Sequence, residues 1–287
     1  MRKTRSIRQD VTRRKLIHIL LVFLAFSLAV VFAFPLYWLV RSTLVSNQEL
    51  LHRPPVYFPT AFHVENFSKA LARIDFMRQL YNSVSIAVPY VLGTLITTSF
   101  AGYAFARLRF PLRGMWFTLV ISTMMLPSAV TLLPQYSLYA SMGLANKAAL
   151  ILPAFFCAGG NAYFVFLLRQ FFLTIPMEMD EAARIDGAGY LRIYSSIMLP
   201  LIRPAMIVVG LFSFINCWNE FFYTMIYLKS QDEYTLPLGL YIVNGLKVPN
   251  YEQVLALALI VATPCLVFFF VGNRYFVEGI ALGGIKG

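Results

Sequence analysis

The sequence PMEMDEAARIDGAGYLRIYSSIMLPLIRPA, from Pro176 to Ala205, is a polar island between two apolar runs that are each long enough to cross a bilayer. Its first proline and the acidic residues after it are typical of a helix start, because negative charge there meets the positive end of the helix dipole. Gly187 can take the left-handed conformation that ends a helix, which predicts two short helices folded about Asp186 and Gly187. A pair of short helices that projects from the membrane indicates a docking element, because its small residues let another protein approach the backbone closely. These small residues are Ala182, Ala183, Ala188 and Gly189.

The composition is that of a membrane protein. Of the 287 residues, 59% are hydrophobic and 13% are charged, whereas soluble chains carry about 25% charged residues. Apolar runs of roughly 20 residues or more predict an all-α protein with six spanning helices. Pro127 and Pro134 leave the ends of the third run open. The predicted spans are 16–40, 81–106, 115–138, 148–170, 204–228 and 253–273.

The net charge of +11 does not require a nucleic-acid partner, because most of the 24 basic residues lie in segments that share one side of a membrane. The positive-inside rule makes that side the cytosol. It then holds the N-terminal residues 1–15, the loop with Arg107, Arg109 and Arg113, the loop 174–204 and the tail 274–287. We therefore expect a multi-pass protein of a plasma or inner membrane, surrounded by lipid, with both termini in the cytosol. The run 16–40 is predicted to be a retained helix rather than a cleaved signal sequence, because it is too long and lacks a small-residue cleavage site.

The segment 41–80 is the longest expected outside the cytosol. It begins with a proline-rich stretch, and ENFSKALARIDFMRQL then places apolar residues at helical spacing. This predicts an amphipathic helix on the outer membrane surface.

No catalytic or metal site emerges from the sequence. The three histidines and three cysteines are scattered, without metal-ligand or disulfide spacing. A phosphate-binding loop of the form G-x-x-x-x-G-K-[ST] is also missing, so the chain is not expected to hydrolyse ATP by itself or to bind a cofactor.

The island EAARIDGAG, followed by I-x-LP, resembles the cytoplasmic loop of the permease subunits of ABC importers. With the further stretches below, the chain is similar to the carbohydrate branch, specifically the maltose-type or glycerol-3-phosphate-type second permease subunit. The further stretches are AGYAFARLRF at 101–110, MMLPSAV at 124–130, FLLRQFF at 166–172, CWNEF at 217–221 and RYFVEGIALGGIKG at 274–287. The residues that match the ATPase-docking loop of the family, including its arginine, are Glu181, Ala182, Ala183, Arg184, Asp186, Gly187, Ala188, Gly189, Ile197, Leu199 and Pro200.

The resemblance implies a type I ABC importer permease fold, with the permease domain over 75–273 and the loop 174–204 as coupling element. It also implies the partners: a second, homologous permease subunit, two ATP-binding subunits that carry ATP and magnesium, and an extracytoplasmic sugar-binding protein. The carried substrate would be a carbohydrate, and the host would be bacterial or archaeal.

One predicted span carries a polar stripe. Ser213, Asn216, Glu220 and Thr224 are spaced by three or four residues, so they share one face of a helix. A carboxylate is costly against lipid, so this face should meet protein or water. Two interpretations remain open, a lining of the transport path and a hydrogen-bonded seam between helices.

Two other functions compete with the importer subunit. An ion-coupled secondary transporter would show internal repeats and intramembrane coupling charges, whereas only Glu220 stands within a span and no repeat is evident. An intramembrane enzyme would need a nucleophile and a base at membrane depth, and only His18, near a helix end, is offered. The sequence leaves the identity of the carbohydrate and the residues that meet the binding protein undetermined.

Overall fold

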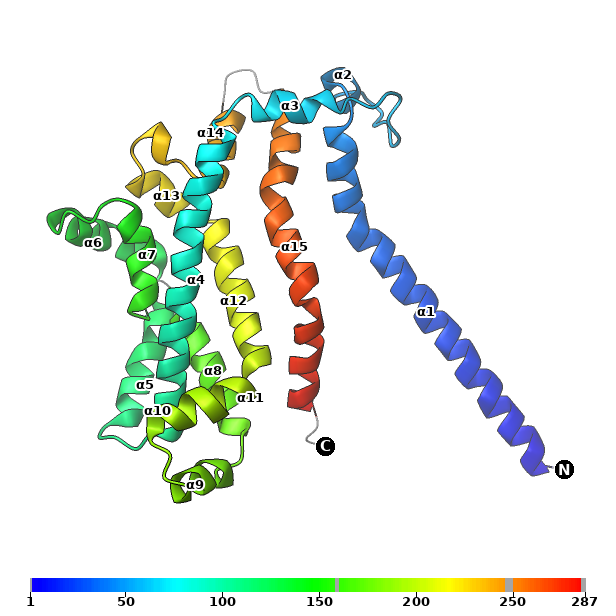
Figure 1. Ribbon diagram of the computed structural model, residues 1–287. Helices are drawn as coiled ribbons and strands as arrows, with labels where there is room; N and C mark the ends of the chain where they lie inside the picture. The colour runs from blue at the N-terminus through cyan, green and yellow to red at the C-terminus, as the bar shows by residue number, and fades with distance from the viewer. Residues whose placement is uncertain (1, 158–159, 246–249, 285–287) are drawn as a thin grey trace. The chain divides into compact units, whose positions relative to one another are not determined.

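The computed structural model describes residues 2–157, 160–245 and 250–284 (Figure 1). Every regular element in these ranges is helical, and no strand occurs among them, which confirms the predicted all-α class. Inside a bilayer no water satisfies the backbone, and a helix satisfies its own N–H and C=O groups. For residues 2–13 and 273–284 only the backbone is described, so the side chains of most of the predicted cytosolic N-terminus and of the whole tail lie outside the described part.

The chain divides into two compact units, residues 1–73 with 246–260 (unit 1) and residues 74–245 with 261–287 (unit 2). Unit 1 holds three helices and the first residues of the last helix of the chain, α15. Their bounds are Arg2–Thr43 for α1, Asn47–Leu50 for α2, Glu65–Leu71 for α3 and Tyr251–Gly284 for α15.

Within unit 1, buried hydrogen bonds hold the loop that follows α1. Asn66 Nδ2 donates to the carbonyls of Thr43, at 3.0 Å, and Val45, at 2.9 Å. Arg41 and Glu49 form an ion pair of 3.0 Å with little exposure of either side chain. The first part of the predicted outer segment, up to Asn66, is therefore held against the end of α1 by these contacts.

The predicted amphipathic helix of the outer segment is shorter than expected. α3 ends at Leu71, and a new helix, α4, begins at Phe76. The carboxylate of Asp75 accepts a hydrogen bond of 3.3 Å from the backbone N–H of Arg78, which is the N-cap arrangement that starts a helix. The aspartate thus separates two helices where apolar spacing alone predicts one.

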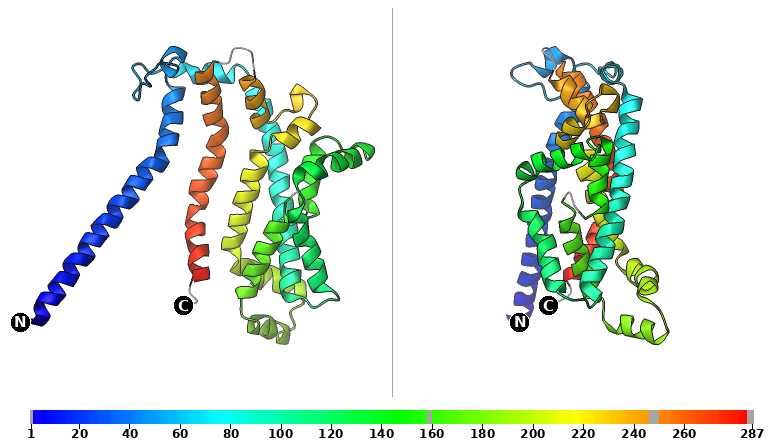
Figure 2. Two further views of the ribbon diagram at one scale, coloured as in Figure 1. Left: turned by 180° about the vertical axis from the view of Figure 1, so that it is seen from behind. Right: turned by 90° about the vertical axis from the view of Figure 1, so that its left-hand side faces the viewer.

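Unit 2 is built around the long helix α4. Figure 2 shows from two further sides that α8 and α12 run beside it, and these pairs share extensive contacts. The described elements of the unit before α15 are α4 (Phe76–Arg107), α5 (Arg113–Ser122), η1 (Thr123–Met125), α6 (Ser128–Ser141), α7 (Lys147–Phe155), α8 (Ala162–Thr174), α9 (Glu178–Ile185), α10 (Tyr190–Ile193), η2 (Tyr194–Met198), α11 (Leu199–Leu201), α12 (Arg203–Trp218), α13 (Phe222–Tyr227), η3 (Gln231–Glu233) and α14 (Leu236–Asn244).

Three helices in the described part are long and apolar enough to cross a membrane alone, and up to six spans result if each sharply bent helix pair counts as one. The three are Arg14–Thr43 of α1, Phe76–Arg107 and Tyr251–Gly272 of α15. They correspond to the first, second and sixth predicted spans.

The other three predicted spans are interrupted. In the range 115–138 the chain bends by 103° between η1 and α6. Leu126 is extended there, as expected for the residue before Pro127, which itself precedes the first residue of α6. The range 148–170 contains both α7 and α8, and the range 204–228 contains α12 and α13 with a break between them. Hydropathy records the apolar character of these stretches but not their backbone breaks.

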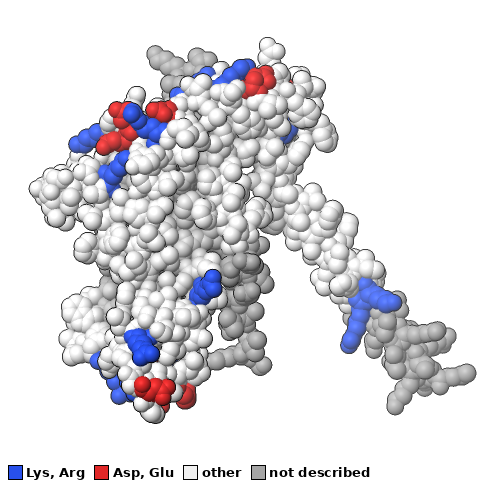
Figure 3. Space-filling view, in the orientation of Figure 1, with Lys and Arg blue, Asp and Glu red and all other residues white. Residues whose placement is uncertain are grey.

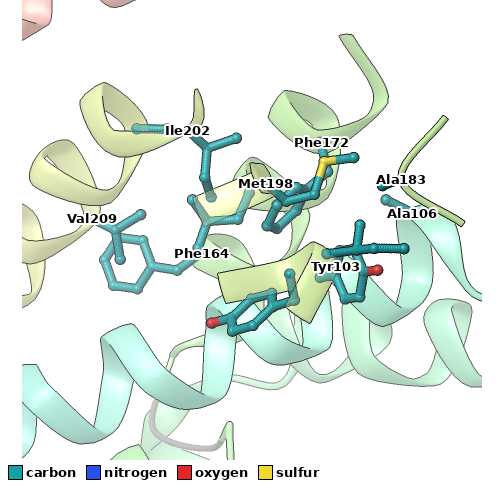
Figure 4. Close-up of a cluster of buried hydrophobic side chains, with 12 residues drawn as sticks. Tyr103, Ala106, Phe164, Phe172, Ala183, Met198, Ile202 and Val209 are labelled. Carbon is teal, nitrogen blue, oxygen red and sulfur yellow. The ribbon is translucent and has the colours of Figure 1, made fainter. Parts of the chain in front are cut away.

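A cluster of buried apolar side chains joins α4, α8, α9, η2 and α12 (Figure 4). Phe172, Leu168 and Val209 are fully buried in it, and Ala183 contributes from α9. Burial of each large apolar side chain contributes roughly 1.5–3 kcal/mol where water is the alternative. The polar island is therefore packed onto the helices of the unit and does not hang from them as a free loop.

Charged side chains of unit 2 gather toward its two ends. On the face shown in Figure 3, red and blue side chains lie around α9 and the helices after it, and again near the loop before α14, with an almost uncharged surface between. An uncharged belt between charged ends is the pattern of a membrane-embedded body.

Candidate functional site

The polar island folds into two short helices, as predicted. α9 ends at Ile185, Asp186 is its C-cap, and Gly187 has a φ of +79°. The N–H of Ala188 donates to the carbonyl of Ala183 at 2.9 Å, and that of Gly187 donates to Arg184 at 3.0 Å. These two bonds form a Schellman motif, which satisfies carbonyls at the end of α9 and turns the chain into α10.

The two faces of α9 meet different surroundings. Glu181, Ala182 and Ile185 are exposed and are spaced by one, three and four residues, so they share one face. Asp180 and Ala183 are buried on the other side. Ala183 therefore packs against the chain's own core and is not available to a partner, whereas Ala182 is.

Apolar side chains are exposed at the tip of the island. Ile185 is 86% exposed, Leu191 is 67% exposed and Tyr190 is 58% exposed. The guanidinium of Arg184 lies 5.0 Å from the ring centroid of Tyr190, which fixes the side of α9 against the start of α10. Exposed apolar residues rimmed by polar ones are typical of surfaces that bind a protein or a membrane. We call the exposed residues Glu181, Ala182, Ile185, Tyr190 and Leu191 the docking face.

The second half of the island is anchored to α4. Ile193, Tyr194 and Met198 are buried. The hydroxyl of Tyr194 lies 2.7 Å from Ser99 Oγ, and its ring stacks on Phe100 with centroids 4.5 Å apart. The segment that follows the docking face is thus held against α4 by packing and by this polar contact.

The remaining predicted loop residues divide between the inside and the surface. Ala188, Ile197 and Leu199 are half-buried and pack against the apolar cluster. Asp186, Gly187 and Gly189 are exposed near the turn, and Pro200 is exposed farther along the chain. The small residues of the motif therefore serve internal packing as well as surface access.

The structure adds Arg107, which the sequence indicates only as one more cytosolic charge. It is the last residue of α4, and its side chain is 1% exposed. Its Nη2 donates to the carbonyls of Phe172 and Ile175, each at 2.5 Å, and its Nη1 lies 3.0 Å from Asp180 Oδ2. The sequence signal for it is the stretch AGYAFARLRF, in which Arg107 directly follows the apolar run 81–106.

Asp180 is the buried partner of that arginine. Its side chain is 1% exposed. Burial raises the pKa of the Asp180 carboxyl, and the guanidinium of Arg107 opposes this rise. Arg107 thus gives the largest compensation of the Asp180 charge, and Arg184 adds to it.

The predicted polar stripe falls on a broken helix. α12 ends at Trp218 and α13 begins at Phe222. Glu220 lies in the break, and its Oε1 accepts a hydrogen bond of 2.8 Å from the N–H of Tyr223, at the start of α13. Irregular backbone at membrane depth is tolerated only where protein or water surrounds it, so both interpretations of the stripe require that this break be shielded from lipid.

The other members of the stripe bond within their own segments. Ser213 Oγ donates to the carbonyl of Gly210 at 3.0 Å, and Thr224 Oγ1 donates to that of Phe221 at 2.7 Å. Both side chains are buried, whereas Asn216 is exposed. The described bonds of Ser213, Glu220 and Thr224 are thus local, and they do not form the seam between helices that the spacing allows.

Comparisons with known proteins agree with this architecture. The sequence model of the family described as binding-protein-dependent transport system inner membrane component matches residues 93–276. The arabinooligosaccharides transport system permease protein AraQ of Halalkalibacterium halodurans is 32% identical over 264 residues, which cover 91% of this chain and 93% of AraQ. The sn-glycerol-3-phosphate transport system permease protein UgpE of Rhizobium meliloti is 30% identical over 263 residues, covering 88% and 91%.

A solved structure shares the fold. It is the crystal structure of a bacterial ABC transporter involved in the import of the acidic polysaccharide alginate, and one of its chains superposes with a TM-score of 0.76 at 22% identity. The match covers 91% of this chain and 97% of that chain.

Proposed function

This chain belongs to the family of binding-protein-dependent transport system inner membrane components, and from that premise we propose that it is a permease subunit of an ATP-driven carbohydrate importer. It forms part of the translocation path in a cell membrane and is driven by ATP hydrolysed on a separate subunit. The observation that carries this proposal is the docking face, whose apolar residues Ile185, Tyr190 and Leu191 are exposed beside charged side chains and are followed by a segment that packs on α4.

The partners follow from the family in general terms: another permease, an ATPase and a binding protein. We propose the finer arrangement of one homologous permease and two ATP-binding subunits, with magnesium and ATP held by the latter. The docking face would insert into one ATPase subunit, so that closure of the nucleotide site moves α9. The N-terminus, the island and the C-terminus would then all lie in the cytosol, as the distribution of basic residues predicts.

The substrate class rests on the relatives. Their names include transport systems for arabinooligosaccharides, galactooligosaccharides, lactose and sn-glycerol-3-phosphate. Three of these names give saccharides and one gives a polyol phosphate, and we propose a carbohydrate for this chain. The stripe residues Asn216 and Glu220, at the break between α12 and α13, are our candidates for the wall of the path.

Reconstitution tests this function against an ion-coupled carrier, which the family assignment does not support. The chain is placed in liposomes with its permease, ATPase and binding-protein partners, and uptake of labelled oligosaccharides is measured. We expect uptake to require ATP and to be indifferent to imposed proton or sodium gradients, and the chain alone to show no ATPase activity. Uptake by the chain alone under an ion gradient would contradict the proposal.

The turn at Gly187 offers a test of the docking geometry. An added Cβ would meet nothing within 4 Å in this chain, so within the chain a substitution acts through the positive φ. A residue with a Cβ pays about 1–2 kcal/mol in this conformation, more if it is β-branched, whereas asparagine tolerates it. We expect Gly187→Val to reduce the ATPase that co-purifies by about tenfold at unchanged membrane abundance.

Gly187→Asn is the matched control and should retain most of the ATPase, because it adds more atoms than valine without the same strain. Equal loss with both substitutions would show that bulk at the interface, and not the turn, decides docking.

A further inference from the structure

One arginine joins three segments at the cytosolic end of unit 2. The guanidinium of Arg107, at the end of α4, contacts the carbonyls of Phe172 and Ile175 at the end of α8 and the carboxylate of Asp180 in α9. Its Nη1 also contacts the sulfur of Met177. α4, α8 and α9 therefore meet at a single buried charge.

Arg107 compensates a buried negative charge or partial charge in both α8 and α9. The last carbonyls of a helix lack partners within the helix and carry its negative dipole end, so a cation is favourable at the end of α8. In the described structure, both carboxylate oxygens of Asp180 are buried without a hydrogen-bond partner. The ion contact with Arg107 supplies the compensation that a buried carboxylate requires.

Separating Arg107 from Asp180 carries a large cost in free energy. Separating the two partners of a buried ion pair leaves each charge uncompensated, which is strongly unfavourable. If α9 moved by itself, it would leave Asp180 and the guanidinium unpaired at 1% exposure each. A displacement of α9 that keeps the pair intact has to carry the ends of α4 and α8 with it.

α4 and α8 already pack as one body. A Cβ on Gly102 of α4 would lie 3.1 Å from the backbone nitrogen of Arg169 and 3.1 Å from Leu168 Cβ, so the two helices approach to backbone contact. Motion that reaches the Arg107 joint thus reaches both helices together.

Resting on the proposed function, we infer that the Arg107–Asp180 pair is a positioning element that transmits the motion of α9 to α4 and α8, in addition to any contribution to folding. The docking face receives the ATPase, and the buried pair converts that contact into movement of the spanning helices. Without the pair, ATP hydrolysis would continue but would no longer be coupled to transport.

The test measures transported substrate per ATP hydrolysed in the reconstituted complex. Asp180→Asn keeps the shape of the side chain and removes its charge, and Arg107→Lys keeps the charge but loses the fork that reaches three acceptors. For both we expect membrane abundance and ATPase co-purification within about twofold of wild type, continued hydrolysis, and a fall of about tenfold or more in uptake per ATP, which is a typical coupling free energy.

The matched control is Asp232→Asn. It removes the same charge from a pair with Arg78 in which both side chains are exposed, and exposed pairs contribute little. Its ratio of uptake to hydrolysis should equal that of wild type. A wild-type ratio in Asp180→Asn would overturn the inference, and so would loss of the ATPase from that variant, because the pair would then shape docking alone. Failure of the wild-type chain to retain any ATPase would instead contradict the proposed function.

A second measurement applies if these variants do not accumulate in the membrane. Spin labels on Met179 of α9 and Leu173 of α8, both exposed, report the distance between these helices in the assembled wild-type background. We expect this distance to change by less than roughly 2 Å, the size of an ordinary helix shift, between nucleotide-free and ATP-bound states. A larger change would show that α9 moves independently and would overturn the inference.

Discussion

Ile185→Asp is expected to remove the ATPase from the purified complex and to abolish uptake, while the chain remains in the membrane at wild-type abundance. Ile185 is 86% exposed, so the isolated chain gains no strain and loses no core contact from the change. At an interface the substitution forfeits roughly 1.5–3 kcal/mol of apolar burial and adds the desolvation of a carboxylate. A loss of at least about 3 kcal/mol corresponds to roughly a hundredfold weaker association.

Ile185→Met is the control, since it keeps an apolar side chain of similar volume and should retain the ATPase. The measurement is the amount of ATPase that co-purifies with a tagged chain, normalised to the chain itself. Wild-type retention with Ile185→Asp would show that α9 does not dock through this face, and the proposed mechanism would lose its main support.

The island was predictable from the sequence because its signals are local. An acidic first turn and a glycine that can adopt positive φ specify two short helices whatever surrounds them, and Gly187 indeed has a φ of +79°. Which alanine faces inward is not a local property. Ala182 and Ala183 are neighbours of the same size, yet Ala183 alone is buried, because the apolar cluster lies on its side of α9.

The breaks in the spans were not predicted from the sequence, for a different reason. A hydropathy window sums composition, and the residues from 219 to 221 are as compatible with a helix as their neighbours. The structure shows the break, where the carboxylate of Glu220 accepts a hydrogen bond from the N–H of Tyr223. A proline gives better warning, as Pro127 does at the bend between η1 and α6, because it restricts the residue before it.

The Arg107–Asp180 pair was hidden because its members are far apart in the chain. Counting charges assigns the arginine to the cytosol by the positive-inside rule, which treats it as a solvated group. Only the packing of α8 against α4 places the carbonyls of Phe172 and Ile175 around it. Burial and partners belong to tertiary structure, so a charge at a helix end cannot be judged from its sequence position.

Gly102→Leu is expected to have the largest effect on stability. α4 and α8 touch at this residue, where even a Cβ would come within 3.1 Å of the backbone nitrogen of Arg169. A contact at this distance is tighter than ordinary van der Waals packing, and backbone cannot move aside as the end of a side chain does. Overpacking of a core costs about 1–3 kcal/mol, and the rigid neighbour places leucine at the upper end of that range.

The series Gly102→Ala, Gly102→Val and Gly102→Leu should therefore lower the midpoint of thermal unfolding in detergent step by step. A loss near 3 kcal/mol corresponds to roughly 6–12 °C for a chain of about this size. Gly114→Leu is the matched control, because it lies in α5 and an added Cβ there meets nothing within 4 Å. Equal shifts at Gly102 and Gly114 would contradict close packing of α4 on α8. They would also remove the reason for treating the two helices as one body, because motion delivered at Arg107 could then dissipate between them.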